Sequence, residues 1–223
     1  TYVAYLNRIK QETKAQLNSG SFQENRMNIL ANLTRLRQLC CHPGMFLENY
    51  EGGSGKLDEL LHFMKEAKAN GQRVLIFSQF TTMLSMIAQA FDREGWSYYY
   101  LDGRTPSEER VKMADQFNNG DKDAFLISLK AGGTGLNLTG ADTVVLFDLW
   151  WNPAVEHQAA DRAHRIGQKR VVQVIKLISQ GTIEEKIQAL QNKKKALFDQ
   201  VIQSGETNLT SLSEEDIREL LDI

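Results

Sequence analysis

Two arginines three positions apart, Arg162 and Arg165, are the residues of this sequence best suited to bind an anion. Gln158 precedes Arg162 by four positions, while Asn152 and Pro153 supply an N-cap residue and a first helical residue. The spacing predicts a helix on which the three side chains project from one face within a narrow arc. Two guanidiniums on one face repel each other unless an anion or a carboxylate lies between them, and each presents a donor fork suited to phosphate oxygens.

The alternative is a solvent-exposed helix, ended by Gly167, whose arginines pair with Asp161 and other surface acids. Spacing alone leaves both interpretations open. The surroundings favour anion binding, because the helix follows a predicted strand ending at Asp148 and its opposite side offers His157 and His164 for packing.

A glycine-rich turn, Lys130–Gly135, follows a predicted strand that ends at Leu129. Glycines let the backbone approach an anion closely, and exposed N–H groups can cradle phosphate. The turn is not a dinucleotide-binding fingerprint, because Leu138 stands where a third glycine is needed, and no Gly-Lys-Ser/Thr follows that would make a P-loop. The alternative is a turn that only permits tight strand–helix geometry.

Other candidate sites are weaker. Cys40 and Cys41 are adjacent and offer neither a disulfide framework nor the spacing of a zinc site, so we predict no metal. The segment Ser54–Leu57 lacks the upstream glycine and the Ser/Thr after lysine of a P-loop, and we predict a loop followed by a helix start. Trp150 and Trp151 could stack on a sugar or base, although buried packing is the commoner fate of tryptophan.

The composition is that of a globular protein rather than a membrane-spanning one. The 223 residues are 42% hydrophobic and 24% charged, and no signal-peptide pattern opens the sequence. No apolar run approaches the ~20 residues that span a bilayer. A net charge of −2 does not indicate nucleic-acid binding, but a local basic stripe is sufficient for it. Lys193–Lys195 is one basic run, although such runs are usually solvated helix faces.

Alternating strand and helix patterns predict an α/β fold. Five short runs rich in branched or aromatic residues are the predicted strands: Val74–Phe80, Tyr98–Leu101, Ala124–Leu129, Thr143–Leu149 and Val171–Ile178. Near-continuous apolar strands separated by helical stretches favour a parallel sheet covered by helices on both faces. In such sheets ligands gather at the carboxyl ends of the strands.

The sequence divides into four predicted parts. Residues 1–47 form a helical projection, 48–55 a flexible link rich in glycine, 56–181 the sheet domain, and 182–223 a set of C-terminal helices. An apolar stripe at helical spacing in the first part is formed by Ile29, Leu33, Leu36 and Cys40. The first residue is threonine rather than methionine, which suggests a fragment of something longer.

Taken together, these segments resemble the C-terminal lobe of the Swi/Snf family of superfamily-two helicase-like ATPases, in the family's order and over most of the chain. The matching segments are Leu36–Pro43 (the box before the lobe), Ser54–Leu57 with Val74–Phe80 (motif IV region), Leu101–Thr105 (the next motif), Leu126–Asp142 (motif V), and Trp151–Pro153 with Gln158–Gln168 (motif VI). The string Asp161–Gln168 distinguishes the family from RNA helicases, whose counterpart ends Gly-Arg. The resemblance implies a RecA-like sheet domain.

The resemblance also implies residue roles. Arg162 and Arg165 correspond to the arginine fingers that reach across a cleft to the γ-phosphate of ATP, and Gln158 to the glutamine that supports that site. The residues that would couple the nucleotide cleft to the DNA groove are Gly133, Gly135 and Asn137. The positions expected along the tracked DNA strand are Ser78, Gln79, Gly103, Arg104, Thr105, Lys130, Gly132, Thr134 and Trp151. Contacts mainly to backbone phosphates imply sequence-independent, salt-sensitive binding.

A complete motor of this family needs elements that this sequence lacks. A Walker-type Gly-Lys-Thr loop and an Asp-Glu acidic box are absent, so the resemblance places them on a first RecA-like lobe outside the sequence. ATP and Mg²⁺ are then cofactors of the two-lobe protein, and we expect the isolated lobe to be a monomer that binds no nucleotide and is inactive. The expected partners are the first lobe and double-stranded DNA, with no membrane.

The alternative function is a non-catalytic docking module for RNA polymerase or another DNA-bound protein. Loss of ATPase activity in an Arg162→Ala variant of the complete protein would favour the motor, whereas unchanged ATPase activity with lost partner binding would favour docking. The absence of an appended reader domain suggests a bacterial protein of the cytoplasm, associated with the nucleoid; a nuclear location is the alternative.

Overall fold

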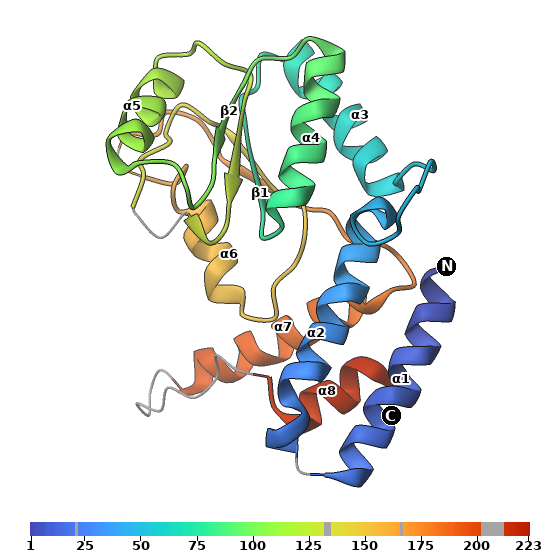
Figure 1. Cartoon of the computed structure of the whole chain (residues 1–223). Coiled ribbons are helices and arrows are strands. Elements are labelled where there is room, and N and C mark those ends of the chain that lie inside the picture. The colour runs from blue at the N-terminus through green and yellow to red at the C-terminus, as the bar shows by residue number, and fades with distance from the viewer. Residues whose placement is uncertain (21, 132–134, 166, 202–211) are drawn as a thin grey trace. The chain divides into compact units, whose positions relative to one another are not determined.

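The structure is a computed structural model that describes residues 1–20, 22–131, 135–165, 167–201 and 212–223 (Figure 1). Contacts divide the chain into two units. The sheet unit contains Gly53–Leu149 and Ala154–Ile178, and the helical unit contains Thr1–Gly52, Trp150–Pro153 and Ser179–Ile223. The predicted boundaries of the four parts stay a prediction. Within the described residues, no helix is long and apolar enough to cross a membrane.

The sheet unit is built on five parallel strands in the order β2-β3-β1-β4-β5. The strands are β1 (Val74–Ser78), β2 (Tyr98–Leu101), β3 (Ala124–Ser128), β4 (Thr143–Leu146) and β5 (Gln173–Lys176). The predicted α/β class and RecA-like parallel sheet are confirmed, and each predicted strand run contains one observed strand. The register pairs Ser78 with Ser128 and Leu101 with Ile127, so the carboxyl ends of β1, β2 and β3 meet at one edge of the sheet.

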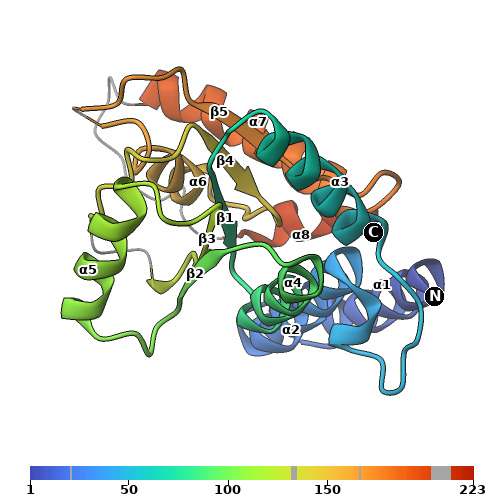
Figure 2. The same cartoon turned by 90° about the horizontal axis from the view of Figure 1, so that it is seen from above.

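Helices cover both faces of the sheet because alternate strand residues point to opposite sides. Leu75 and Phe77 of β1 belong to a core cluster that also takes in residues of α5 (Ser107–Asn118) and α6 (Pro153–Ala160). The intervening residues Val74 and Ile76 are equally buried, and α4 (Thr81–Glu94) contacts β1, β2 and β3. Figure 2 shows α4 and α5 on opposite sides of the sheet. A further helix, α3 (Gly55–Ala69), precedes β1.

Ser54 begins α3 as its N-cap residue. The Ser54 hydroxyl oxygen accepts a hydrogen bond from the Leu57 amide at 3.3 Å, which satisfies one N–H of the first helical turn. The Lys56 side chain is buried, with its ammonium 5.6 Å from the centroid of the Phe147 ring. The predicted helix start is confirmed, and the Lys56 side chain lies inside the protein.

In its described residues, the helical unit contains four α-helices and one 3₁₀-helix. These are α1 (Tyr2–Ser19), α2 (Phe22–Cys41), the 3₁₀-helix η1 (Pro43–Met45), α7 (Ile183–Val201) and α8 (Glu214–Leu221). Contacts join α1 to α2, α2 to α7, and α7 to α8. The predicted apolar stripe of α2 is buried: Ile29, Leu33, Leu36 and Cys40 are each at most 7% exposed. The stripe is therefore the face through which α2 packs.

The basic run on α7 faces the acidic helix α8. The Lys193 ammonium lies 2.9 Å from a Glu219 carboxylate oxygen, and the Lys194 ammonium lies 2.9 Å from a carboxylate oxygen of Asp216. Asp216 also caps α8 together with Ser213. Lys193 and Lys194 of the basic run therefore form ion pairs within the helical unit.

Candidate functional site

Helix α6 ends at Ala160, before either arginine, so the prediction of a helix that runs to Gly167 is wrong. After Ala160 the backbone closes into turns, with Ala163 N–H bonded to the Ala160 carbonyl at 3.1 Å and Arg165 N–H to the Ala163 carbonyl at 3.1 Å. Consequently Gln158, which is exposed on α6, does not share a helical face with Arg162 and Arg165.

Arg162 is buried in the sheet unit, with 5% of its surface exposed. Its guanidinium carbon lies 5.2 Å from the centroid of the Phe77 ring, and its carbonyl accepts a hydrogen bond from Leu138 N–H at 2.9 Å. Burial, followed by repulsion from Arg165, lowers the pKa of Arg162 to about 10. The side chain therefore stays charged at neutral pH, in a place where its charge is costly.

Arg165 is exposed and lies against the glycine-rich segment. Its Nη1 donates a 2.7 Å hydrogen bond to the carbonyl of Gly135. Gly135 has a positive φ of 33°, a backbone conformation that L side chains rarely adopt. Gly135 and Asn137 are both exposed, and the carbonyl of Asn137 accepts a hydrogen bond from the Asn118 side chain at 2.8 Å.

Gln168 completes a set of hydrogen bonds between residues 135–141 and 162–168. Its side-chain nitrogen donates to the carbonyls of Thr139, Ala141 and Ala163 at 3.2, 2.7 and 3.1 Å. Its side-chain oxygen accepts from Arg170 N–H at 2.9 Å. With the Leu138–Arg162 and Gly135–Arg165 bonds, this set fixes the arginine segment to the segment after the glycine turn. The sequence assigned no role to Gln168, because nothing local in it reveals partners about thirty residues away.

Gly140 supports this arrangement and gives a test of it. A Cβ at Gly140 would lie 2.7 Å from Asn118 Cα and 3.0 Å from the Phe117 carbonyl oxygen, both of which belong to backbone. We expect Gly140→Ala to lower the free energy of unfolding by about 2 kcal/mol, because neither atom can move away as a flexible side chain would. Chemical denaturation of the chain measures this value. Gly55→Ala is the control, since no atom lies within 4 Å of its added Cβ; equal effects of the two substitutions would contradict the packing argument.

Ser78 and Gln79 lie at the end of β1 and are buried around Asp148. The Ser78 hydroxyl donates to one carboxylate oxygen of Asp148, and the Gln79 side-chain nitrogen donates to the other at 2.7 Å. Gln79 N–H also bonds to Asp148 at 3.3 Å. The structure therefore assigns these predicted DNA-contact residues a role in tying the end of β1 to the end of the β4 segment. Their predicted contact with DNA stays a prediction.

Gly103, Arg104 and Thr105 form the loop after β2, which Asp102 organises. The Asp102 carboxylate accepts hydrogen bonds from Arg104 N–H at 2.9 Å and from its guanidinium at 2.8 and 3.2 Å, and these bonds hold the pKa of Asp102 below its usual value. The Thr105 hydroxyl oxygen accepts from Asp102 N–H at 3.2 Å. The Arg104 side chain is 89% exposed despite this ion pair. Most of the Arg104 side chain therefore lies at the surface of the protein.

Lys130 is exposed at the end of the β3 segment, where Leu129 N–H bonds to the Ser78 carbonyl at 3.0 Å. The structure thus brings the predicted positions after β1, β2 and β3 to one sheet edge. Gly132, Gly133 and Thr134 lie outside the described residues.

Trp151 belongs to the helical unit, where it stacks on Trp150. Their ring centroids are 4.4 Å apart with an interplanar angle of 29°. The guanidinium of Arg37, a residue only 1% exposed, lies 5.0 and 4.9 Å from the two centroids. This cation–π arrangement holds the segment that leads into α6. The sequence did not reveal Arg37, because its partners are more than a hundred positions away.

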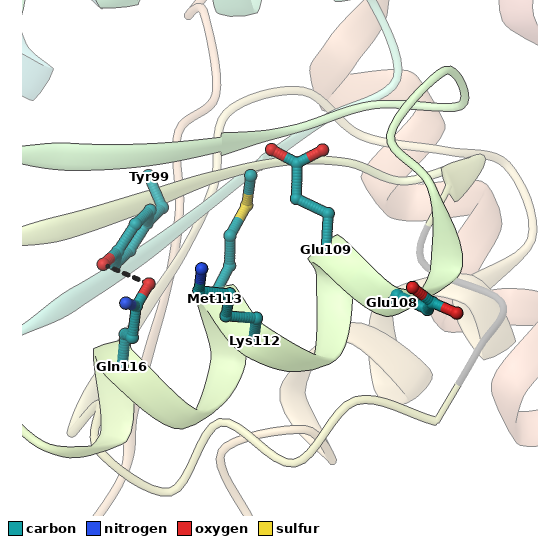
Figure 3. A pocket seen from close by; sticks show the side chains of 6 residues that line it. All are labelled: Tyr99, Glu108, Glu109, Lys112, Met113 and Gln116. Carbon is teal, nitrogen blue, oxygen red and sulfur yellow. Dashed lines mark hydrogen bonds between the residues drawn. The ribbon is translucent and has the colours of Figure 1, made fainter.

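Two surface hollows of the sheet unit do not involve the predicted site residues. The first, of about 460 Å³, lies between β2 and α5 and is shown in Figure 3; it is lined by Tyr99, Glu108, Glu109, Lys112, Met113 and Gln116. The second, of about 300 Å³, is lined by Arg73, Asn118, Thr139, Gly140, Gly167, Gln168, Lys169 and Arg170. In the second hollow Arg73 donates to the carbonyls of Lys122, Phe117 and Gly140, and Arg170 pairs with Asp142. These cations therefore have partners within the protein.

Known proteins share both the sequence and the fold. The sequence-family model of the helicase conserved C-terminal domain matches residues 55–167 of this chain. A putative ATP-dependent helicase/translocase of Bacillus subtilis, YwqA, is 41% identical over 216 residues, which cover 94% of this chain and 23% of that protein. The mouse SWI/SNF-related matrix-associated actin-dependent regulator of chromatin subfamily A member 1 is 42% identical over 200 residues, covering 84% of this chain and 19% of that protein.

Solved structures give the same result. The SWI2/SNF2 ATPase core of Sulfolobus solfataricus in complex with double-stranded DNA is 33% identical, with a TM-score of 0.76 over 98% of this chain and 47% of that chain. The C-terminal domain of that ATPase, also 33% identical, has a TM-score of 0.71 and covers 97% of this chain and 92% of that chain.

The fold and these matches define the class as the C-terminal RecA-like domain of a helicase-like ATPase. The chain belongs to the helicase conserved C-terminal domain family and is the C-terminal helicase lobe of a Swi/Snf-type ATPase. It spans less than a quarter of the length of the curated relatives described above.

Proposed function

We propose that this lobe supplies Arg162 and Arg165 to the γ-phosphate of an ATP that is bound, with Mg²⁺, by a first RecA-like lobe outside this sequence. Charge that develops on the transferred phosphoryl group is stabilised by preorganised cations, and guanidiniums suit its oxygens. Gln158 supports this site from α6. Neither arginine performs acid–base chemistry in this scheme; both act by their positive charge and their donor geometry.

The observation that carries the proposal is the placement of the two arginines. Arg162 is 5% exposed, and its pKa is lowered partly by Arg165. Bringing a phosphate to the pair therefore relieves a repulsion that is already present in the folded lobe. The hydrogen bonds of Leu138, Gly135 and Gln168 hold both arginine residues in place before any ligand binds. Preorganisation of this kind means that little rearrangement is needed in the transition state.

The second part of the proposal is that the carboxyl edge of the sheet contacts duplex DNA. Arg104 and Lys130 supply exposed positive charge there, while Gly103 and Thr105 shape the loop. Ser78, Gln79, Gly132, Thr134 and Trp151 are the other proposed contributors. Gly133, Gly135 and Asn137 link this edge to the arginines, because Gly135 is bonded to Arg165. A related ATPase core has been solved with double-stranded DNA, which supports a DNA-binding role for this lobe.

Hydrolysis of ATP by the full-length protein, with and without duplex DNA, tests the proposal. We expect duplex DNA to stimulate turnover irrespective of its sequence. We also expect the logarithm of the DNA-binding constant to fall linearly with the logarithm of salt concentration, because phosphate contacts release counterions. Turnover that ignores DNA would contradict a DNA-dependent motor. A protein that loses a DNA-bound partner such as RNA polymerase on Arg162→Ala, but keeps its ATPase activity, would instead be a docking module.

A further inference from the structure

The side chain of Arg110 joins two loops that leave neighbouring strands. Arg110 lies on the first turns of α5 and is half-buried. Its Nε donates to the Thr105 carbonyl at 2.7 Å, and its Nη2 donates to the carbonyls of Asp102 and Gly103 at 3.4 and 3.3 Å. Its Nη1 donates to the Ala131 carbonyl at 3.0 Å. One guanidinium therefore holds the loop after β2 and the loop after β3 together.

A guanidinium is suited to this task by its shape. Its five N–H groups are fixed in a plane and point in different directions, so one side chain reaches carbonyls of separate segments. A lysine ammonium in the same place has three donors on one atom and would serve one loop or the other. The arrangement therefore depends on arginine itself, and positive charge alone would not reproduce it.

The two loops carry several of the residues that we assign to DNA, and of these Gly103, Arg104 and Lys130 are exposed. Gly103, Arg104 and Thr105 lie within the first loop, and Lys130 immediately precedes Ala131 in the second. Arg110 contacts the carbonyl groups of these loops and leaves the Arg104 side chain 89% exposed. Its side chain is thus placed to fix the spacing between two phosphate-binding groups without being one of them.

We propose that Arg110 is a positioning residue that sets the distance between the Arg104 loop and Lys130, and so matches the two cations to successive contacts on a DNA backbone. The inference rests on the proposed DNA-binding function. It assigns to Arg110 an effect on DNA affinity that acts through Arg104 and Lys130, and no contact with ATP.

Variants of the full-length protein test this inference. Arg110→Lys keeps the positive charge but cannot bridge the loops, and Arg110→Gln removes both the charge and the bridge. Lys112→Gln is the matched control, because Lys112 is an exposed cation of the same helix. We measure the DNA concentration that gives half-maximal stimulation of ATP turnover, together with the KM for ATP. Amide hydrogen exchange at Asp102, Arg104 and Thr105, whose N–H groups are bonded within the loop, reports the loop directly.

We expect both Arg110 variants to raise the half-maximal DNA concentration about tenfold and to speed exchange in the loop, because each loses bonds from a charged donor. The KM for ATP should stay within about twofold of its original value, and the control should resemble the original protein. A variant that unfolds more easily but keeps the original DNA dependence would overturn the inference and leave Arg110 with a stability role only. A lack of DNA stimulation in the unaltered protein would reject the proposed function itself.

Discussion

Arg165→Ala in the full-length protein is expected to lower ATP turnover by about a thousandfold or more. Arginines that stabilise the transferred phosphoryl group contribute on this scale, because the charge they neutralise is greatest in the transition state. Arg165 is exposed and its guanidinium is held by the carbonyl of Gly135, so its removal takes away a preorganised cation without breaking the core. Steady-state kinetics at saturating ATP and DNA measures the effect. We expect Arg165→Lys to be nearly as damaging, since lysine lacks the planar fork.

Lys169→Ala is the matched control for Arg165→Ala, because it removes an exposed positive charge four positions along the same segment. We expect it to change turnover by less than about twofold, since surface charges away from the reacting group act weakly through solvent. Equal losses in the two variants would mean that turnover depends on the general charge of this surface and that Arg165 has no specific role.

Arg162→Met is expected to lower ATP turnover about as much as Arg165→Ala does, and yet to stabilise the isolated lobe by about 1 kcal/mol. Burying a charged guanidinium beside a second one costs free energy, and methionine fills much of the same space without charge. The predicted gain in stability is well below the free energy that corresponds to the full lowering of the pKa of Arg162, because the contact with Phe77 offsets part of the cost of burying the charge. Chemical denaturation of the lobe measures the gain, and ATP turnover of the full-length protein measures the loss.

The pH dependence of this gain has a definite sign. The pKa of Arg162 is about 10 in the folded lobe, below the ordinary value of an arginine, so the folded state binds this proton less tightly than the unfolded state. The cost of the buried charge is therefore fully present below pH 10 and declines as the pH rises from there towards the ordinary pKa of an arginine. The stability difference between Arg162→Met and the original lobe should be constant near neutral pH. A destabilised Arg162→Met lobe would show that the guanidinium contributes net stability to the fold.

The sheet could be predicted from the sequence because its signals are local. The strands β1, β3 and β4 are short runs that are buried along their whole length, and parallel strands buried on both faces have no alternation to obscure them. The ends of the strands were predicted less accurately. The run predicted as Thr143–Leu149 pairs with its neighbouring strands only over Thr143–Leu146. Beyond Leu146 the chain continues with single bonds, such as Phe147 N–H to the Phe77 carbonyl, which apolar character does not distinguish from strand pairing.

The candidate site was less predictable because distant residues decide its geometry. A helical repeat placed Arg162 and Arg165 on one face, but the carbonyl of Arg162 bonds to Leu138 and the side chain of Arg165 to Gly135. These bonds draw the chain out of the helix after Ala160. The buried hydroxyl of Ser78 likewise donates a hydrogen bond to Asp148, which lies seventy positions further along the chain. The identity of the site residues came from their order in family motifs, whereas their arrangement depends on contacts that spacing does not encode.

The most direct test of the split-site mechanism is ATP hydrolysis in the presence of duplex DNA, measured in one series. The series compares the isolated lobe, the full-length protein and its Arg165→Ala variant. The mechanism predicts no hydrolysis by the isolated lobe, DNA-stimulated hydrolysis by the full-length protein, and loss of that hydrolysis in the variant. Hydrolysis by the isolated lobe, or a variant as active as the original protein, would contradict the assignment of this lobe as the arginine-bearing half of the site.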